Sequence, residues 1–124
     1  MKFIENCMKA LEKETSTKYH ICIVDNGSTD GSRQWVEKNC PYAQVIALEE
    51  NTGFCGAVNA GIKASLTPYV ILLNNDTEVE YGFVKALEKA LETEKNSFSV
   101  SAKMVDMYDK YILDGAGDLY CALG

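Results

Sequence analysis

The chain has 124 residues, with 12 Lys or Arg against 18 Asp or Glu and one His, so its net charge is −6 and its pI is about 4.7. This length suits one domain that can bury a core without metals or disulfides. Because no Lys or Arg cluster accompanies the acidic balance, we expect no nucleic-acid partner, and an anionic ligand would need backbone N–H groups or a metal.

Helical and strand patterns alternate along the first part of the chain. Apolar residues recur every three or four positions within residues 3–13, which predicts an amphipathic helix. Residues 20–24 then form an apolar run that stops at the turn residues 25–28, which is typical of a strand buried on both faces. A second helix is expected from residue 28 or 30 to residue 39, since both positions offer capping side chains.

The same alternation continues through the rest of the chain. We expect a short strand at residues 45–48 and a helix of small residues at about 55–65. A third buried strand at residues 69–73 and a further helix at about 80–94 should follow. Apolar and polar residues then alternate from 98 to 104, which predicts a strand with one buried face. The order predicts a single α/β domain over residues 1–124, with an open, mainly parallel sheet and flanking helices.

Polar side chains follow two of these strands. Asp25 and Asn26 end one, and Asn74, Asn75 and Asp76 end another. The carboxyl ends of parallel strands meet at one edge of a sheet, so we expect Asp25 and Asp76 to lie at the same edge. One carboxylate suits a ribose hydroxyl or a base N–H, and the other, beside amides, suits Mg²⁺ or Mn²⁺. Both stretches are also good turn and helix-cap sequences, which is the structural alternative.

Four motifs stand in order along the chain. Residues 23–32, IVDNGSTDGS, resemble the nucleotide-binding turn of family 2 glycosyltransferases, and residues 51–61, NTGFCGAVNAG, resemble the next signature of that family. Residues 72–79, LLNNDTEV, resemble its metal-binding DxD stretch in the variant of rhamnosyltransferase-like members, and residues 115–118, GAGD, resemble the segment that follows. The resemblance implies the GT-A fold, here as its Rossmann-like nucleotide-binding half.

The resemblance also implies roles for individual residues. It implies a nucleoside-diphosphate sugar donor, for which we expect a UDP- or dTDP-sugar, a Mg²⁺ or Mn²⁺ cofactor, and transfer to a hydroxyl of a glycan or lipid-linked acceptor. Asp76 is the expected metal ligand. The residues expected to bind the nucleotide sugar are Asp25, Gly27, Gly53, Asn59, Asn75 and Asp76. No residue is assigned as the catalytic base.

The sequence departs from the family pattern at several places. Asn74 stands at the first DxD position, and Val58 stands where many members carry an arginine facing the nucleotide. The family's opening strand would precede the helix at residues 3–13, and its acceptor half would follow Gly124, so we expect a partial domain, trimmed at both ends. A sheet without that strand would expose unpaired backbone groups, from which we predict dimerisation or strand exchange.

Two other functions remain as alternatives. The chain could be a non-catalytic nucleotide-binding or oligomerising relic of such an enzyme. A phosphoacceptor receiver domain is disfavoured, because Asn26 breaks the acidic pair that such a domain needs. Five widely spread cysteines without a Cys-x-x-Cys pair predict reduced thiols and a cytoplasmic protein, and the longest aliphatic run, residues 70–73, predicts no membrane-spanning segment.

Overall fold

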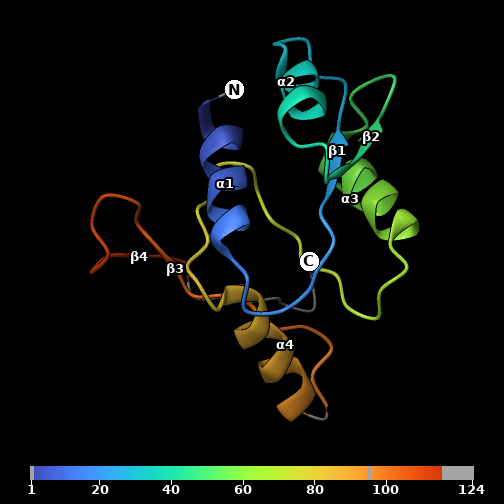
Figure 1. The fold of residues 1–124 in the computed structure, drawn as a ribbon. Coiled ribbons are helices and arrows are strands. Elements are labelled where there is room, and N and C mark those ends of the chain that lie inside the picture. Colours follow the sequence, from blue (N-terminus) through green and yellow to red (C-terminus); the bar gives the residue numbers. More distant parts are fainter. Residues whose placement is uncertain (1, 95, 116–124) are drawn as a thin grey trace, which may run out of the picture. The chain divides into compact units, whose positions relative to one another are not determined.

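The computed structural model describes residues 2–94 and 96–115. Within this part of the chain the elements follow one another in an α/β order (Figure 1): α1 (Lys2–Lys13), β1 (Cys22–Asp25), α2 (Ser32–Asn39), β2 (Gln44–Ala47), α3 (Gly53–Ala64), α4 (Phe83–Thr93), β3 (Met104–Val105) and β4 (Leu113–Gly115). They fall into two compact units, Met1–Phe83 and Val84–Gly124. The assignment of residues 1–124 to one domain stays a prediction.

The first unit is built on a parallel pair of strands. β1 and β2 pair in parallel, with Ile23 opposite Val45 and Val24 opposite Ile46. Side chains alternate between the faces of a strand, and here Ile23 and Val45 pack toward the cluster formed by α1 and α2, whereas Val24 meets α3. Helices therefore cover both faces, which confirms the two predicted strands and explains their apolar sequences.

The core of this unit lies between α1 and α2. The buried residues of α1 recur at spacings of three or four, and they contact buried residues at the end of α2. This cluster consists of Ile4, Cys7, Met8, Leu11, Val36 and Cys40, with Trp35 packed against it. The amphipathic pattern predicted for residues 3–13 is thereby confirmed.

Small residues bring α3 close to the sheet. A Cβ atom placed on Gly61 would lie 3.2 Å from Cγ2 of Val24, which is tighter than an ordinary contact. A side chain at position 61 would push the helix away from β1. The predicted helix of small residues is confirmed, although it begins at Gly53 rather than near residue 55.

The strand predicted at residues 69–73 does not form. These residues lie outside any strand, and Tyr69, Val70, Ile71 and Leu72 are 39–58% exposed, whereas Leu73 packs against the core cluster. A strand needs a neighbour for its backbone N–H and C=O groups. Among the described residues β2 is the only partner of β1, and no strand borders residues 69–73. The prediction of a buried strand at residues 69–73 is therefore wrong, although Leu73 packs against the core cluster.

The second unit contains most of α4 and a short antiparallel pair. β3 and β4 pair Met104 with Gly115 and Val105 with Leu113, around an irregularity in register. The strand predicted over residues 98–104 is thus reduced to its end, and Phe98 is 99% exposed. In residues 2–94 and 96–115 no helix is long and apolar enough to cross a membrane. The described cysteines carry free thiols, and Cys121 lies outside the described residues.

Candidate functional site

The carboxyl end of β1 carries a buried carboxylate. Asp25 is the last residue of the strand and is 9% exposed. Its Oδ1 accepts a hydrogen bond from the backbone N–H of Ser28 at 3.3 Å, and its backbone carbonyl accepts one from Leu48 at 2.9 Å. Asp25 therefore begins the turn after β1, as the structural alternative predicts, while it stands at the strand end where α/β proteins bind ligands.

Asn26 joins the loop after β1 to the loop before α3. Its Nδ2 donates to Oδ1 of Asn51 at 3.0 Å and to the carbonyl of Gly53 at 3.1 Å. Its Oδ1 accepts hydrogen bonds from Thr52, from the backbone N–H at 2.9 Å and from the hydroxyl at 3.1 Å. The first two motif segments therefore meet along one edge of the sheet, which we call the rim and define as residues 25–27 and 51–53.

Two glycines of the rim serve different purposes. Gly27 has φ 74°, and a Cβ atom there would lie 3.0 Å from backbone atoms of Glu50 and Asn51. Gly53 has φ 73°, but a Cβ atom there would meet no other atom within 4 Å. Both backbone conformations favour glycine. At Gly27 the close approach is to the neighbouring loop, whereas at Gly53 the space beside the backbone is open.

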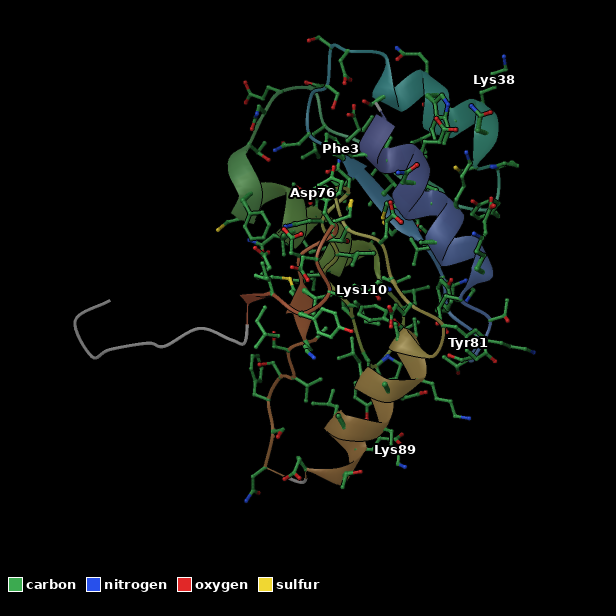
Figure 2. All side chains as sticks on the ribbon, turned by 90° about the vertical axis from the view of Figure 1, so that its left-hand side faces the viewer. Phe3, Lys38, Asp76, Tyr81, Lys89 and Lys110 are labelled. Atoms are coloured by element: carbon green, nitrogen blue, oxygen red, sulfur yellow. The ribbon has the colours of Figure 1, made fainter. Side chains whose placement is uncertain are left out.

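Asn75 and Asp76 lie in a turn that packs against α1. The carbonyl of Asn74 accepts hydrogen bonds from the backbone N–H and the hydroxyl of Thr77, at 3.3 and 2.7 Å, which closes the turn. The Sγ atom of Cys7 lies 3.9 Å from the same carbonyl. Figure 2 labels Asp76 in this turn and Phe3 in the N-terminal part of α1. Asn75 and Asp76 are exposed, so their side chains are available to a ligand.

A second contact with α1 lies just after this turn. The Asn6 side chain donates to Oε1 of Glu78 at 3.0 Å. Burial, followed by the negative charges of Asp76 and Glu78, raises the pKa of the Cys7 thiol. The carboxylates of Asp76 and Glu78 thus both place negative charge near Cys7, and such a concentration of negative charge favours a cation.

A positive charge lies near Asp25. The hydrogen bond that Arg33 donates to Glu37, the charge of Glu37 and, to a smaller extent, the charge of Asp25 raise the pKa of the Arg33 guanidinium. Arg33 is the only arginine of the sequence, and its Nε donates to Oε1 of Glu37 at 2.8 Å. Arg33 could not be predicted as a site residue, because a lone charged residue on a helix surface gives no signal by its spacing.

The predicted site residues fall into groups. Asp25, Gly27 and Gly53 belong to the rim, and Asn75 and Asp76 belong to the turn against α1. Asn59 is exposed on α3, and its side chain makes no hydrogen bond to another described residue. In the described ranges no hydrogen bond joins the rim to the turn, so the shared position of Asp25 and Asp76 stays a prediction. The motif at residues 115–118 lies outside the described residues beyond Gly115.

The donor set was tested for its fit to Mg²⁺ or Mn²⁺. Over residues 2–94 and 96–115 no three His, Cys, Asp or Glu side chains are arranged to hold a metal. These ions, however, are commonly bound through one or two carboxylates and the phosphates of a substrate. The exposed carboxylate of Asp76, beside the amides of Asn74 and Asn75 and near Glu78, offers such oxygen donors. The residues present fit a metal that is completed by a ligand's phosphates.

Sequence reasoning missed two residues that build the rim. Asn26 was named as a polar residue at the strand end and as the break in an acidic pair, and Thr52 only as part of the second motif, but neither was predicted to hold the two loops together. The signal for both was the spacing of amide and hydroxyl residues across two motifs, but pairing them requires the parallel register of β1 and β2. That register brings residue 26 beside residues 51–53, which are 25–27 positions away.

Parallel strands with helices on both faces and polar loops at their carboxyl ends define an α/β domain with its candidate site at that edge. The family model of glycosyl transferase family 2 matches residues 1–112. The chain therefore belongs to glycosyl transferase family 2, and its helices and small parallel sheet are consistent with the GT-A fold.

Individual relatives agree with this assignment. A teichoic acid poly(glycerol phosphate) polymerase of Staphylococcus epidermidis is 29% identical over 75% of this chain and 14% of its own length. The putative teichuronic acid biosynthesis glycosyltransferase TuaG of Bacillus subtilis is 32% identical over 73% of this chain and 36% of its own. The uncharacterized glycosyltransferase YibD of Escherichia coli is 33% identical over 59% of this chain and 22% of its own. The chain thus matches between about a seventh and about a third of these relatives.

Proposed function

We propose that this chain is the donor-binding part of a family 2 glycosyltransferase, which binds a nucleoside-diphosphate sugar with a divalent metal. The observation that supports this most is the rim, where four hydrogen bonds of Asn26 hold two motif segments together beside the Asp25 carboxylate. A pyrimidine donor, UDP- or dTDP-sugar, is the proposed class, and a glycan or lipid-linked hydroxyl is the proposed acceptor. The cytoplasm is the proposed location.

Each residue has a proposed task at this site. Asp25 accepts hydrogen bonds from the nucleoside, and Gly27 and Gly53 let the ligand approach the backbone of the rim. Asp76 is the proposed ligand of Mg²⁺ or Mn²⁺, with Asn75 beside it, and Asn59 is a proposed contact from α3. The metal, when bound, stabilises negative charge on the departing diphosphate.

The transfer is a displacement at the anomeric carbon of the donor sugar. The acceptor oxygen forms the new bond, the diphosphate leaves with the electron pair of the bond that breaks, and a base removes the hydroxyl proton. The described residues account for the donor side of this reaction. No residue of the chain is proposed as the base.

Titration calorimetry of the chain with UDP and dTDP in the presence of Mn²⁺ tests the donor site. We expect saturable binding. Asp76→Asn should weaken it strongly, because this variant lacks the proposed carboxylate ligand of the metal. The exposed side chain can change without disturbing the core. Glu88→Gln, which removes an exposed carboxylate from α4, is the matched control and should bind like the wild type. Absence of binding by the wild type would overturn the proposal.

A donor-hydrolysis assay separates the enzyme from its alternative. Release of UDP from a UDP-sugar, above the rate of Asp76→Asn, supports a catalytic domain. Binding of UDP with Mn²⁺ but no release supports the non-catalytic nucleotide-binding relic. A mass measurement by light scattering at high concentration tests the predicted homo-oligomer, and a monomeric mass would contradict it.

A further inference from the structure

The side chain of Asn26 uses its whole hydrogen-bonding capacity inside the protein. A side-chain amide has two N–H donors and one oxygen with two lone pairs. In this structure both donors are directed to the loop before α3, at Asn51 and Gly53, and the oxygen accepts twice from Thr52. Nothing is left on this amide for a ligand, although its neighbour Asp25 is a proposed ligand contact.

We propose that Asn26 is a positioning residue, which builds the wall of the donor site formed by residues 51–53 before the nucleotide arrives. The inference rests on the proposed function and deepens it. Ordering a loop on binding costs free energy, so a loop that is already fixed gives a higher affinity. The proposal therefore assigns to Asn26 an effect on nucleotide affinity that does not involve contact with the nucleotide.

Asp25 and Asn26 are neighbours in the rim but have different roles. Asp25 ends β1, and its backbone carbonyl is fixed by Leu48. Asn26 follows. At Gly27 the two loops are so close that an added Cβ atom would lie 3.0 Å from backbone atoms of Glu50 and Asn51. Asn51 also accepts from the N–H of Gly53 at 2.9 Å, which fixes the first residue of α3. Asn26 thus holds a loop that is already close and that leads directly into a helix.

An amide is required for this role rather than a carboxylate. Aspartate at position 26 would keep the two acceptor contacts to Thr52. It would lose both donors and place a negative charge against the carbonyl of Gly53, whose only described side-chain donor is Asn26. Protonation of that aspartate would restore one donor.

The first test measures nucleotide affinity in the full chain. Calorimetry with UDP and Mn²⁺ compares the wild type with Asn26→Ala, Asn26→Asp and the control Asn39→Ala. Asn39 is a matched control because its amide is exposed and donates only within α2, to the carbonyl of Trp35 at 2.7 Å. We expect Asn26→Ala to bind about tenfold more weakly, the effect of losing one or two net hydrogen bonds. Asn39→Ala should stay within about twofold of the wild type.

A pH profile separates positioning from general damage to the fold. The ratio of the affinity of Asn26→Asp to that of the wild type should be low near neutral pH and should rise as the pH falls toward about 4, where an aspartate of ordinary pKa is about half protonated and its carboxyl can donate. A ratio that does not change with pH, or wild-type affinity in Asn26→Ala, would overturn the inference.

A measurement without ligand keeps the inference separate from the proposed function. Amide hydrogen exchange reports on the N–H of Thr52 and the N–H of Gly53 directly. We expect both to lose protection in Asn26→Ala, while the amides of α1 keep theirs. If the wild type binds no nucleotide, the proposed function fails and the exchange result still decides whether Asn26 holds the loop. Unchanged protection of Thr52 would overturn that role.

Discussion

The carboxylate of Glu14 accepts a 2.5 Å hydrogen bond from the backbone N–H of Gly82, which lies 68 residues further along the chain. The same oxygen accepts from the N–H of Phe83 at 3.1 Å, and the other oxygen accepts from the backbone and hydroxyl of Ser16. Glu14 is 2% exposed. A buried charge is tolerated when its oxygens are bonded, so this carboxylate ties the end of α1 to the segment that leads into α4.

Replacement of Glu14 by Gln should lower the free energy of unfolding by about 1–3 kcal/mol near neutral pH, because an NH₂ group would face N–H donors. Burial acts to raise the pKa of Glu14, but the hydrogen bonds from Ser16, Gly82 and Phe83 outweigh it and lower this pKa. The folded pKa therefore lies below the unfolded one, and the stabilisation is present above the unfolded pKa and lost as the pH falls through the folded pKa.

Urea unfolding at neutral pH and at about pH 3 measures this dependence. The difference between the wild type and Glu14→Gln should shrink in acid. Glu88→Gln removes an exposed carboxylate and should change the stability by less than about 0.5 kcal/mol at either pH. Equal stabilities of wild type and Glu14→Gln at neutral pH would contradict the role given to Glu14.

Two glycines offer a matched pair for the rim. Gly27 and Gly31 have φ 74° and 84°, so alanine at either position meets the same backbone cost of about 1–2 kcal/mol. Only at Gly27 would the new Cβ also press on Glu50 and Asn51, whereas at Gly31 nothing lies within 4 Å. We expect Gly27→Ala to be less stable than Gly31→Ala by a further ~1–3 kcal/mol in chemical unfolding. Similar stabilities would show that the two loops do not meet as closely as described.

The local elements of the first unit could be predicted because their signals are local. The spacing of apolar residues in α1 and the uninterrupted apolar run of β1 each indicate which faces are buried, and the structure agrees. Residues 69–73 show the limit of that reasoning. Their apolar run resembles that of β1, but a strand also requires a hydrogen-bonding neighbour, and a sequence window does not show whether one is present.

The candidate site could be predicted only in part, for a related reason. Asp25 could be found because a carboxylate at a strand end is a recognisable pattern. The same reasoning selected Asp76, but the strand expected before it does not form, and the common position of the two residues stays a prediction. The clamp by Asn26 was missed because its partners at positions 51–53 become neighbours only through strand pairing. The contacts of Asn6 and Cys7 with the turn at residues 74–78 depend on how α1 packs, which no motif encodes.

Asn6 should affect metal binding through the turn that contains Asp76. Asn6→Ala removes the 3.0 Å hydrogen bond to Glu78, and an exposed hydrogen bond contributes about 0.5–1.5 kcal/mol. We expect the affinity for Mn²⁺ with UDP to fall by about three- to tenfold, while the free energy of unfolding falls by no more than about 1.5 kcal/mol. Lys9→Ala is the control, because it removes an exposed ion pair with Glu5 on the same helix. If both variants lose the same affinity, the contact with Glu78 has no special role.

The alkylation rates of the cysteines report on both the core and the rim. Cys55 is exposed in the first turn of α3, two residues after Gly53, whereas Cys7 and Cys40 are buried. Burial and the nearby acidic charges also raise the pKa of Cys7, so less of it is thiolate, which is the form that reacts. Iodoacetamide near pH 8, followed by peptide mass analysis, should modify Cys55 early and Cys7 and Cys40 only after unfolding.

The same experiment tests where the nucleotide binds. UDP with Mn²⁺ should slow the alkylation of Cys55, because a ligand at the rim would cover the first turn of α3. Cys22 is exposed at the other end of β1, its pKa is raised by burial, and its rate should not respond to the nucleotide. Rapid alkylation of Cys7 in the native chain would contradict the packing of α1. Equal protection of Cys22 and Cys55 would mean that the nucleotide acts on the whole chain rather than at the rim.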